Sequence, residues 1–140
     1  MSTPVNINRQ TVLYAERDFD FQDLPSGVAK PMIYLPAGSR ILRGAVDITT
    51  AFNAETSTTI TVGDTEGTDD VDRYKAGING KVAAITAFTA ITDSVIDTAE
   101  AVTMTATHVD AAGDLDAGAG KLWIEYVVDN RTTELHAYRG

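Results

Sequence analysis

The sequence predicts an all-β fold, a two-sheet antiparallel β-sandwich with one short helix and extended terminal arms. Thr, Val and Ile make up about three residues in ten, and these β-branched side chains suit a pleated sheet better than a helix. Clusters of Gly, Pro, Ser, Asn and Asp interrupt the chain at turn-like positions. Short strands separated by such turns are typical of a sandwich or a barrel. A chain of 140 residues suits one domain of this kind.

The two ends of the chain differ from its middle. The first and last residues show little apolar periodicity, and terminal segments of this kind become ordered mainly when a partner surface holds them. We therefore expect an N-terminal arm over residues 1–10, a β-sandwich domain over 11–131 and a C-terminal tail over 132–140.

Alternation of apolar and polar side chains predicts about eight strands. The clearest alternation covers residues 42–49, 59–62, 102–107 and 121–129, and residues 11–16, 32–35 and parts of 81–98 complete the set. The last strand is the clearest, and its apolar face carries Leu122, Ile124, Tyr126 and Val128. Trp123 lies on the opposite face, which suggests that this second face is covered as well.

Two inner strands show the same alternation. The strand over residues 42–49 should bury one face, made of Leu42, Gly44, Val46 and Ile48. The strand over residues 102–107 should bury Val102, Met104 and Ala106. Its other face carries Thr103, Thr105 and Thr107, whose hydroxyls are expected to meet water.

One segment departs from this pattern and predicts a short helix over residues 69–76. Thr68 or Asp69 can cap its first N–H groups, and its acidic first turn suits the positive end of the helix dipole. Gly77 can take the left-handed position that ends a helix. The apolar stripe of this helix would consist of Val71, Tyr74 and Ile78.

Charge and composition exclude several partners. The chain has 20 acidic and 11 basic residues, a net charge of -9, which disfavours nucleic acid because phosphate contacts need clustered Lys and Arg. Its longest apolar run is about half of the roughly twenty residues that span a bilayer, and its first residues do not resemble a secretory signal, so no membrane partner is expected. The absence of Cys removes disulfides and thiolate chemistry.

The remaining reactive side chains predict no catalytic residue, no metal site and no cofactor. His108 and His136 are too isolated for a metal-binding His pair, and a structural or solvated role is expected for each. A calcium site is the alternative for the acidic stretch Asp64, Glu66, Asp69, Asp70 and Asp72. That stretch lacks the residue order of a calcium loop, so helix capping and solvation explain it better. The same holds for Asp114 and Asp116.

Several runs of residues resemble a pattern in small virion proteins of tailed bacteriophages. The runs cover residues 35–41, 51–53, 59–64, 72–74 and the closing strand 120–129, and the resemblance spans roughly residues 28–131. The best-understood relatives are the capsid decoration, or cement, proteins. This resemblance implies a β-sandwich of jelly-roll type without enzymatic activity. It also implies a protein made in the host cytoplasm that binds the major capsid protein on the virion exterior and forms a homo-oligomer, a trimer rather than a dimer.

The N-terminal arm is the segment expected to attach to the capsid. Its candidate contact residues are Pro4, Val5, Asn6, Ile7 and Arg9. Val5 and Ile7 alternate with polar residues, so the arm can add as a short strand to an exposed sheet edge. Arg9 can pair with an acidic group on the shell.

Two other functions remain open. The first is a head-fibre, tail or host-surface-binding virion module, because one fold serves many functions. The second, from a different class, is a small metal- or sugar-dependent enzyme. The number of copies in the virion distinguishes these hypotheses, because a cement protein should match the capsid protein in abundance.

Overall fold

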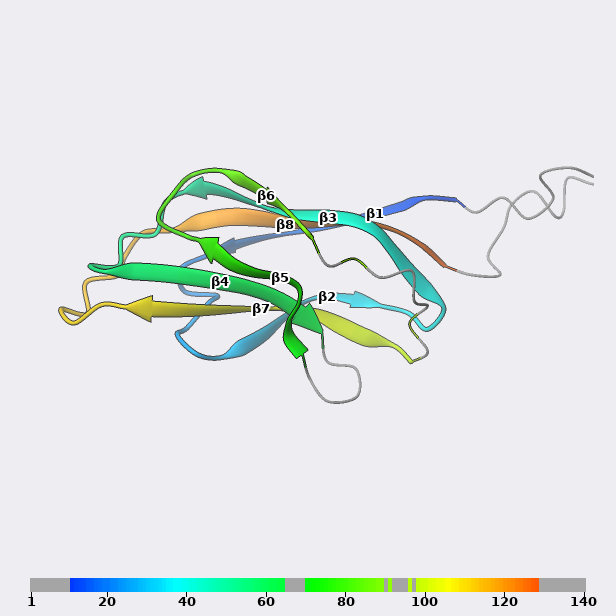
Figure 1. The fold of residues 1–140 in the computed structure, drawn as a ribbon, viewed down its shortest axis with the longest axis horizontal. Helices are drawn as coiled ribbons and strands as arrows, with labels where there is room; N and C mark the ends of the chain where they lie inside the picture. Colours follow the sequence, from blue (N-terminus) through cyan, green and yellow to red (C-terminus); the bar gives the residue numbers. More distant parts are fainter. Residues whose placement is uncertain (1–10, 65–69, 90, 92–95, 97, 129–140) are drawn as a thin grey trace, which may run out of the picture.

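The computed structural model describes residues 11–64, 70–89, 91, 96 and 98–128. These residues form eight strands (Figure 1). The strands are β1 (Leu13–Asp20), β2 (Ala29–Leu35), β3 (Ser39–Thr50), β4 (Ser57–Asp64), β5 (Asp70–Asn79), β6 (Ile85–Ala87), β7 (Glu100–Val109) and β8 (Ala119–Val128). The all-β prediction is confirmed.

The strands build two four-stranded antiparallel sheets that lie face to face (Figure 1). One sheet, here called sheet A, has the order β1-β8-β3-β6, and the other, sheet B, has the order β2-β7-β4-β5. Strands 1 and 8, 2 and 7, 3 and 6, and 4 and 5 are therefore neighbours, as if one long hairpin had been rolled up. This arrangement is the jelly roll, and the predicted sandwich of jelly-roll type is confirmed.

The core lies between the sheets and follows the alternation seen in the sequence. On β8, Leu122 and Ile124 are fully buried, and on β7 the same holds for Val102, Met104 and Ala106. Side chains from the connections close the ends of the core, among them Leu24 and Phe52. The period of two therefore identifies the inner face of the two central strands correctly.

On β3 the predicted inner face is wrong at one position. Leu42 is 42% exposed, whereas Ile41 is buried. The cause is a β-bulge, since Ile41 pairs with Tyr126 and Arg43 with Glu125, which leaves Leu42 as an extra residue. A bulge reverses the faces on one side of it relative to the other, so Gly44, Val46 and Ile48 keep their predicted inward direction.

The predicted helix over residues 69–76 is also wrong, because its described part belongs to β5. Tyr74 and Ile78 are buried, as the predicted stripe required, but both lie on this strand. Val71, the third residue of the supposed stripe, is 43% exposed. Gly77 has a positive φ of 70°, yet it lies at a register shift between β4 and β5 and not at a helix end. Among the described residues, no helix is long and apolar enough to cross a membrane.

The threonines of β7 do not all face water. Thr107 is exposed, as predicted, but Thr103 is 1% exposed. Thr103 pairs with Gly63 of β4, and a Cβ at Gly63 would collide with the backbone of Asp70 and Val71. The beginning of β5 therefore passes over the outer face of sheet B at this point and covers the position next to Thr103.

Candidate functional site

The five residues predicted to bind the capsid, Pro4, Val5, Asn6, Ile7 and Arg9, lie outside the described residues, and so does His136. The described chain begins just before β1, which is an edge strand of sheet A. The arm is therefore continuous in sequence with one edge of the sandwich.

His108 is a structural residue at the rim of the core, as expected. Its Nε2 atom lies 2.8 Å from the carbonyl oxygen of Leu24, which can only accept, so Nε2 donates. Its Nδ1 atom lies 2.9 Å from the hydroxyl of Thr58, and its ring stacks on Phe52 with 5.6 Å between the centroids. Both ring nitrogens are therefore held by contacts within the chain.

The acidic stretch does not form a cation site in the described part of the chain. No group of three or more His, Asp or Glu side chains among the described residues could hold a metal ion. Glu66 and Asp69 lie outside those residues. Asp70 accepts a hydrogen bond from the backbone N–H of Asp72 and, by its side-chain hydrogen bond and charge, raises the pKa of Asp72.

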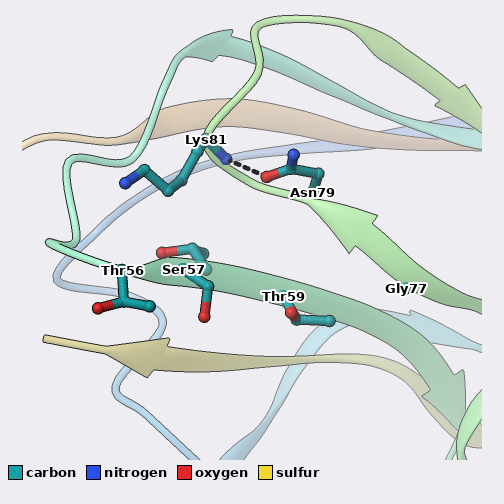
Figure 2. Close-up of a pocket in the computed structure, with 7 residues that line it drawn as sticks. Thr56, Ser57, Thr59, Gly77, Asn79 and Lys81 are labelled. Atoms are coloured by element: carbon teal, nitrogen blue, oxygen red, sulfur yellow. Dashed lines mark hydrogen bonds between the residues drawn. The ribbon is translucent and has the colours of Figure 1, made fainter.

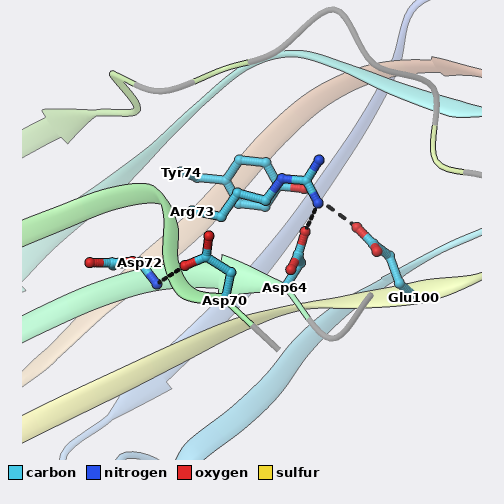
Figure 3. Close-up of polar contacts among 6 residues, drawn as sticks. All are labelled: Asp64, Asp70, Asp72, Arg73, Tyr74 and Glu100. Carbon is cyan, nitrogen blue, oxygen red and sulfur yellow. Dashed lines mark hydrogen bonds and ion pairs between the residues drawn. The ribbon is translucent and has the colours of Figure 1, made fainter. Parts of the chain in front are cut away.

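Asp64 has a different role, which sequence analysis missed. Its side chain is fully buried and forms an ion pair with Arg73 of β5, whose side chain is 28% exposed. Figure 3 shows the guanidinium of Arg73 pointing toward Asp64 and toward Glu100 of β7. Burial works against the charged guanidinium, but the hydrogen bond with Asp64 and its negative charge outweigh burial and raise the pKa of Arg73.

Tyr74 completes this buried cluster. Its hydroxyl donates to Oε1 of Glu100 over 3.4 Å, and its ring stacks on Phe88 with 5.6 Å between the centroids. The guanidinium carbon of Arg73 lies 5.8 Å from the centre of the Tyr74 ring. These hydrogen bonds and ring contacts join the members of the cluster to one another, so we assign the cluster a structural role.

Burial of the Tyr74 phenol, aided by the negative charges of Glu100 and Asp64, raises its pKa well above the ordinary value of 10.0. The folded protein therefore holds this proton more tightly than the unfolded chain, and stability should fall as the pH rises above about 10. Urea unfolding between pH 8 and 11 should show this loss, and Tyr74→Phe should lose stability less steeply. Equal slopes for the two proteins would contradict the prediction.

The pair Asp114 and Asp116 is not a shared carboxylate site. Asp116 accepts a hydrogen bond of 2.6 Å from the side-chain amide of Asn53. The side-chain oxygen of Asn53 in turn accepts the backbone N–H groups of Asp116 and Ala117, each over 3.0 Å. Asp116 therefore helps to hold the loop before β8 against the loop after β3.

The outer face of sheet A carries an aromatic cluster around Trp123. Tyr14 stacks on Trp123 with 6.0 Å between the centroids, and the guanidinium of Arg43 lies 5.5 Å from the centre of the Trp123 ring. Arg43 also binds Glu125 through two hydrogen bonds of 2.8 Å. Part of the cover predicted for Trp123 thus comes from its own chain. Trp, Tyr and Arg are enriched in interface hot spots, so this cluster remains a candidate contact surface.

A polar pocket of about 450 Å³ lies where β4 begins and β5 ends (Figure 2). It is lined by Thr56, Ser57, Thr58, Thr59, Gly77, Asn79 and Lys81. The ammonium of Lys81 donates to the backbone carbonyls of Ala54 and Glu55, at 2.7 and 3.2 Å. Among the lining hydroxyl groups, that of Thr58 is hydrogen-bonded to Nδ1 of His108, and Thr58 itself is buried.

The same fold occurs in chains of three solved phage capsids. In the capsid of Ralstonia phage GP4, the match has a TM-score of 0.69 and 16% identity, and it covers 94% of this chain and 93% of that chain. In the acidic stable capsid structure of Helicobacter pylori bacteriophage KHP30, the match has a TM-score of 0.66 and 16% identity, and it covers 86% of this chain and 93% of that chain. In the cyanophage Pam1 capsid asymmetric unit, the match has a TM-score of 0.65 and 14% identity, and it covers 91% of each chain.

No protein-family model and no curated protein matches the sequence. At 14–16% identity, the structural likeness establishes a shared fold. The match covers nine-tenths or more of each capsid chain, so the likeness extends over nearly the whole of each.

Proposed function

We propose that this protein is a structural component of a tailed-phage virion, a decoration or cement protein that binds the outside of the capsid and stabilises it. The observation that carries the proposal is the likeness to three chains found in phage capsids, each matched over at least 91% of its length.

The chemistry of the described residues supports a binding role. The charges of Asp64 and Arg73 neutralise each other, and His108 is held by backbone and side-chain contacts. A net charge of -9 keeps many copies soluble before assembly. These features fit a protein whose work is attachment.

The proposed partners are the major capsid protein and further copies of this chain, with a trimer favoured over a dimer. The proposed location is the capsid exterior, after synthesis in the host cytoplasm. The proposed division of the chain remains an arm over residues 1–10, the jelly roll over 11–131 and a tail over 132–140. Association of this kind can add stability to a small β-domain.

Counting copies in purified virions tests the proposal. A cement protein should be present at about the abundance of the major capsid protein, and particles assembled without it should break at lower temperature. A few to a few dozen copies per particle would favour a head-fibre, tail or host-binding module instead. Absence from the particle would contradict a virion role altogether.

Deletion of residues 2–9 should leave the jelly roll folded and weaken or abolish attachment to capsids that lack the protein. The reason is that Val5 and Ile7 would enter apolar pockets when the arm adds to a sheet edge. Binding isotherms on such capsids provide the measurement. A matched pair of variants sharpens it, since Val5→Asp with Ile7→Asp should weaken binding far more than Asn6→Asp with Asn8→Asp. Saturation with unchanged affinity after the deletion would show that the arm is not needed.

A further inference from the structure

The backbone of β1 offers hydrogen-bonding groups along the edge that no other described strand pairs with, here called its free edge. Just beyond the strand, the N–H of Phe21 donates to the carbonyl of Gly118 over 2.8 Å. Phe21 and Gly118 continue the register of β1 with β8, so the odd-numbered residues of β1 bond to β8. The N–H and C=O groups of Tyr14, Glu16 and Asp18 therefore point away from the sheet.

The other edge strands are less suitable for pairing with a further strand. On β2, Pro31 has no N–H, and the side chain of Arg17 donates to the carbonyls of Pro31 and Met32, at 3.1 and 3.5 Å. The register of β5 with β4 shifts twice, and β6 is three residues long. Among the described edge strands, β1 alone keeps one register over eight residues.

The side chains of β1 define what such a partner strand must carry. On the outer face, Glu16 and Asp18 are acidic, and the side chain of Asp18 is 84% exposed. Lys121 of β8 balances them only in part, at 3.2 Å from Glu16 and 3.9 Å from Asp18. On the inner face, Leu13 and Ala15 are half-buried. A second copy of β1 would place acid opposite acid, which is unfavourable across a strand pair.

We propose that the free edge of β1 binds an extended segment of the major capsid protein, with basic side chains on its outer face and apolar side chains on its inner face. The segment would pair with the backbone of Tyr14, Glu16 and Asp18, place its cations beside the two carboxylates and cover Leu13 and Ala15. This inference rests on the proposed attachment to a capsid and names the surface that makes the contact. Strand addition of this kind draws affinity from the backbone and specificity from alternate side chains.

Hydrogen exchange at single-amide resolution tests the assignment, with the full-length protein free and bound to capsids assembled without it. The amides of Tyr14, Glu16 and Asp18 should exchange rapidly in the free protein and become protected at least tenfold on the capsid. The amides of Ala15 and Arg17 serve as the internal control, because they already bond to β8. Capsid binding without protection at the three outward amides would overturn the inference and leave the proposed function intact.

Two further results would also be decisive. Failure of the full-length protein to bind such capsids would overturn the inference and the proposed function together. Protection of the three amides in the free protein as its concentration rises would show that a second copy occupies the edge, which would overturn the choice of partner.

A charge reversal provides the second readout. Asp18→Lys should weaken capsid binding about tenfold at low salt, since it places a cation beside the basic segment, and the loss should shrink as salt screens the charges. Asp114→Lys changes the net charge equally at an exposed site far along the chain and should leave binding unchanged. Equal effects of the two variants would assign the loss to net charge and overturn the edge contact.

Discussion

Replacing Arg73 with Met should lower the free energy of unfolding by about 3–5 kcal/mol, because removing one partner of a buried ion pair leaves the other charge uncompensated. The side chain of Asp64 is fully buried, and its Oδ1 atom has no hydrogen-bond partner among the described residues. Glu100, also buried, adds a second negative charge to the same cluster (Figure 3). Chemical denaturation of the purified protein, followed by fluorescence of Trp123, measures the loss.

A double-mutant cycle separates this effect from lost packing. Adding Asp64→Asn to Arg73→Met removes one stranded charge and should recover part of the stability, since an ion pair removed as a whole costs less than one broken. Arg43→Met is the matched control, because Arg43 pairs with Glu125 on the exposed outer face and its side chain is 65% exposed. A loss at Arg73 no greater than the loss at Arg43 would contradict a structural role for the buried pair.

The central strands could be predicted from the sequence because their side chains obey one simple rule. Leu122 and Ile124 are buried on either side of the outward-facing Trp123, and on β7 Val102, Met104 and Ala106 are buried at alternate positions. Burial against the other sheet favours apolar side chains at every second position of a strand, so the sequence of these segments shows a period of two. The same rule fails on β3, because a bulge between Ile41 and Arg43 adds Leu42 as an extra residue. The residue types of this segment do not reveal the bulge.

The segment over residues 70–79 shows a second limit. Tyr74 and Ile78 are both buried, as the apolar stripe of the predicted helix would also require, and Gly77 suits a bulge as well as a helix end. Backbone pairing with β4 favours the extended conformation of this segment over the helical one. The sequence of residues 70–79 alone does not show this pairing.

The buried ion pair illustrates the same difficulty for a site. Asp64, Arg73 and Glu100 come from three different strands, and each alone has the sequence context of a solvated surface charge. Their proximity follows from the order β7-β4-β5 in sheet B. The residues of the candidate arm, in contrast, are identified by sequence alone, and their contacts would be made with another protein.

Replacing Ile124 with Ala should cost about 2–5 kcal/mol, as large-to-small changes do in a packed core. Ile124 is fully buried on the central strand β8, where it packs against the site of Gly44 on β3. A Cβ at Gly44 would collide with the Phe88 ring and come within 2.9 Å of Cγ2 of Ile124, so both side chains pack over residue 44, which has no side chain of its own.

Equilibrium unfolding of three variants on the same strand tests this account. Tyr126→Ala should cost less than Ile124→Ala, because Tyr126 is only partly buried at the end of the core. Glu125→Ala, which removes an outward side chain between them, should cost far less than either. A loss at Glu125 equal to that at Ile124 would mean that the outer face of sheet A carries as much packing as the inner one. That result would favour a second layer over Trp123, built from another copy or from the capsid.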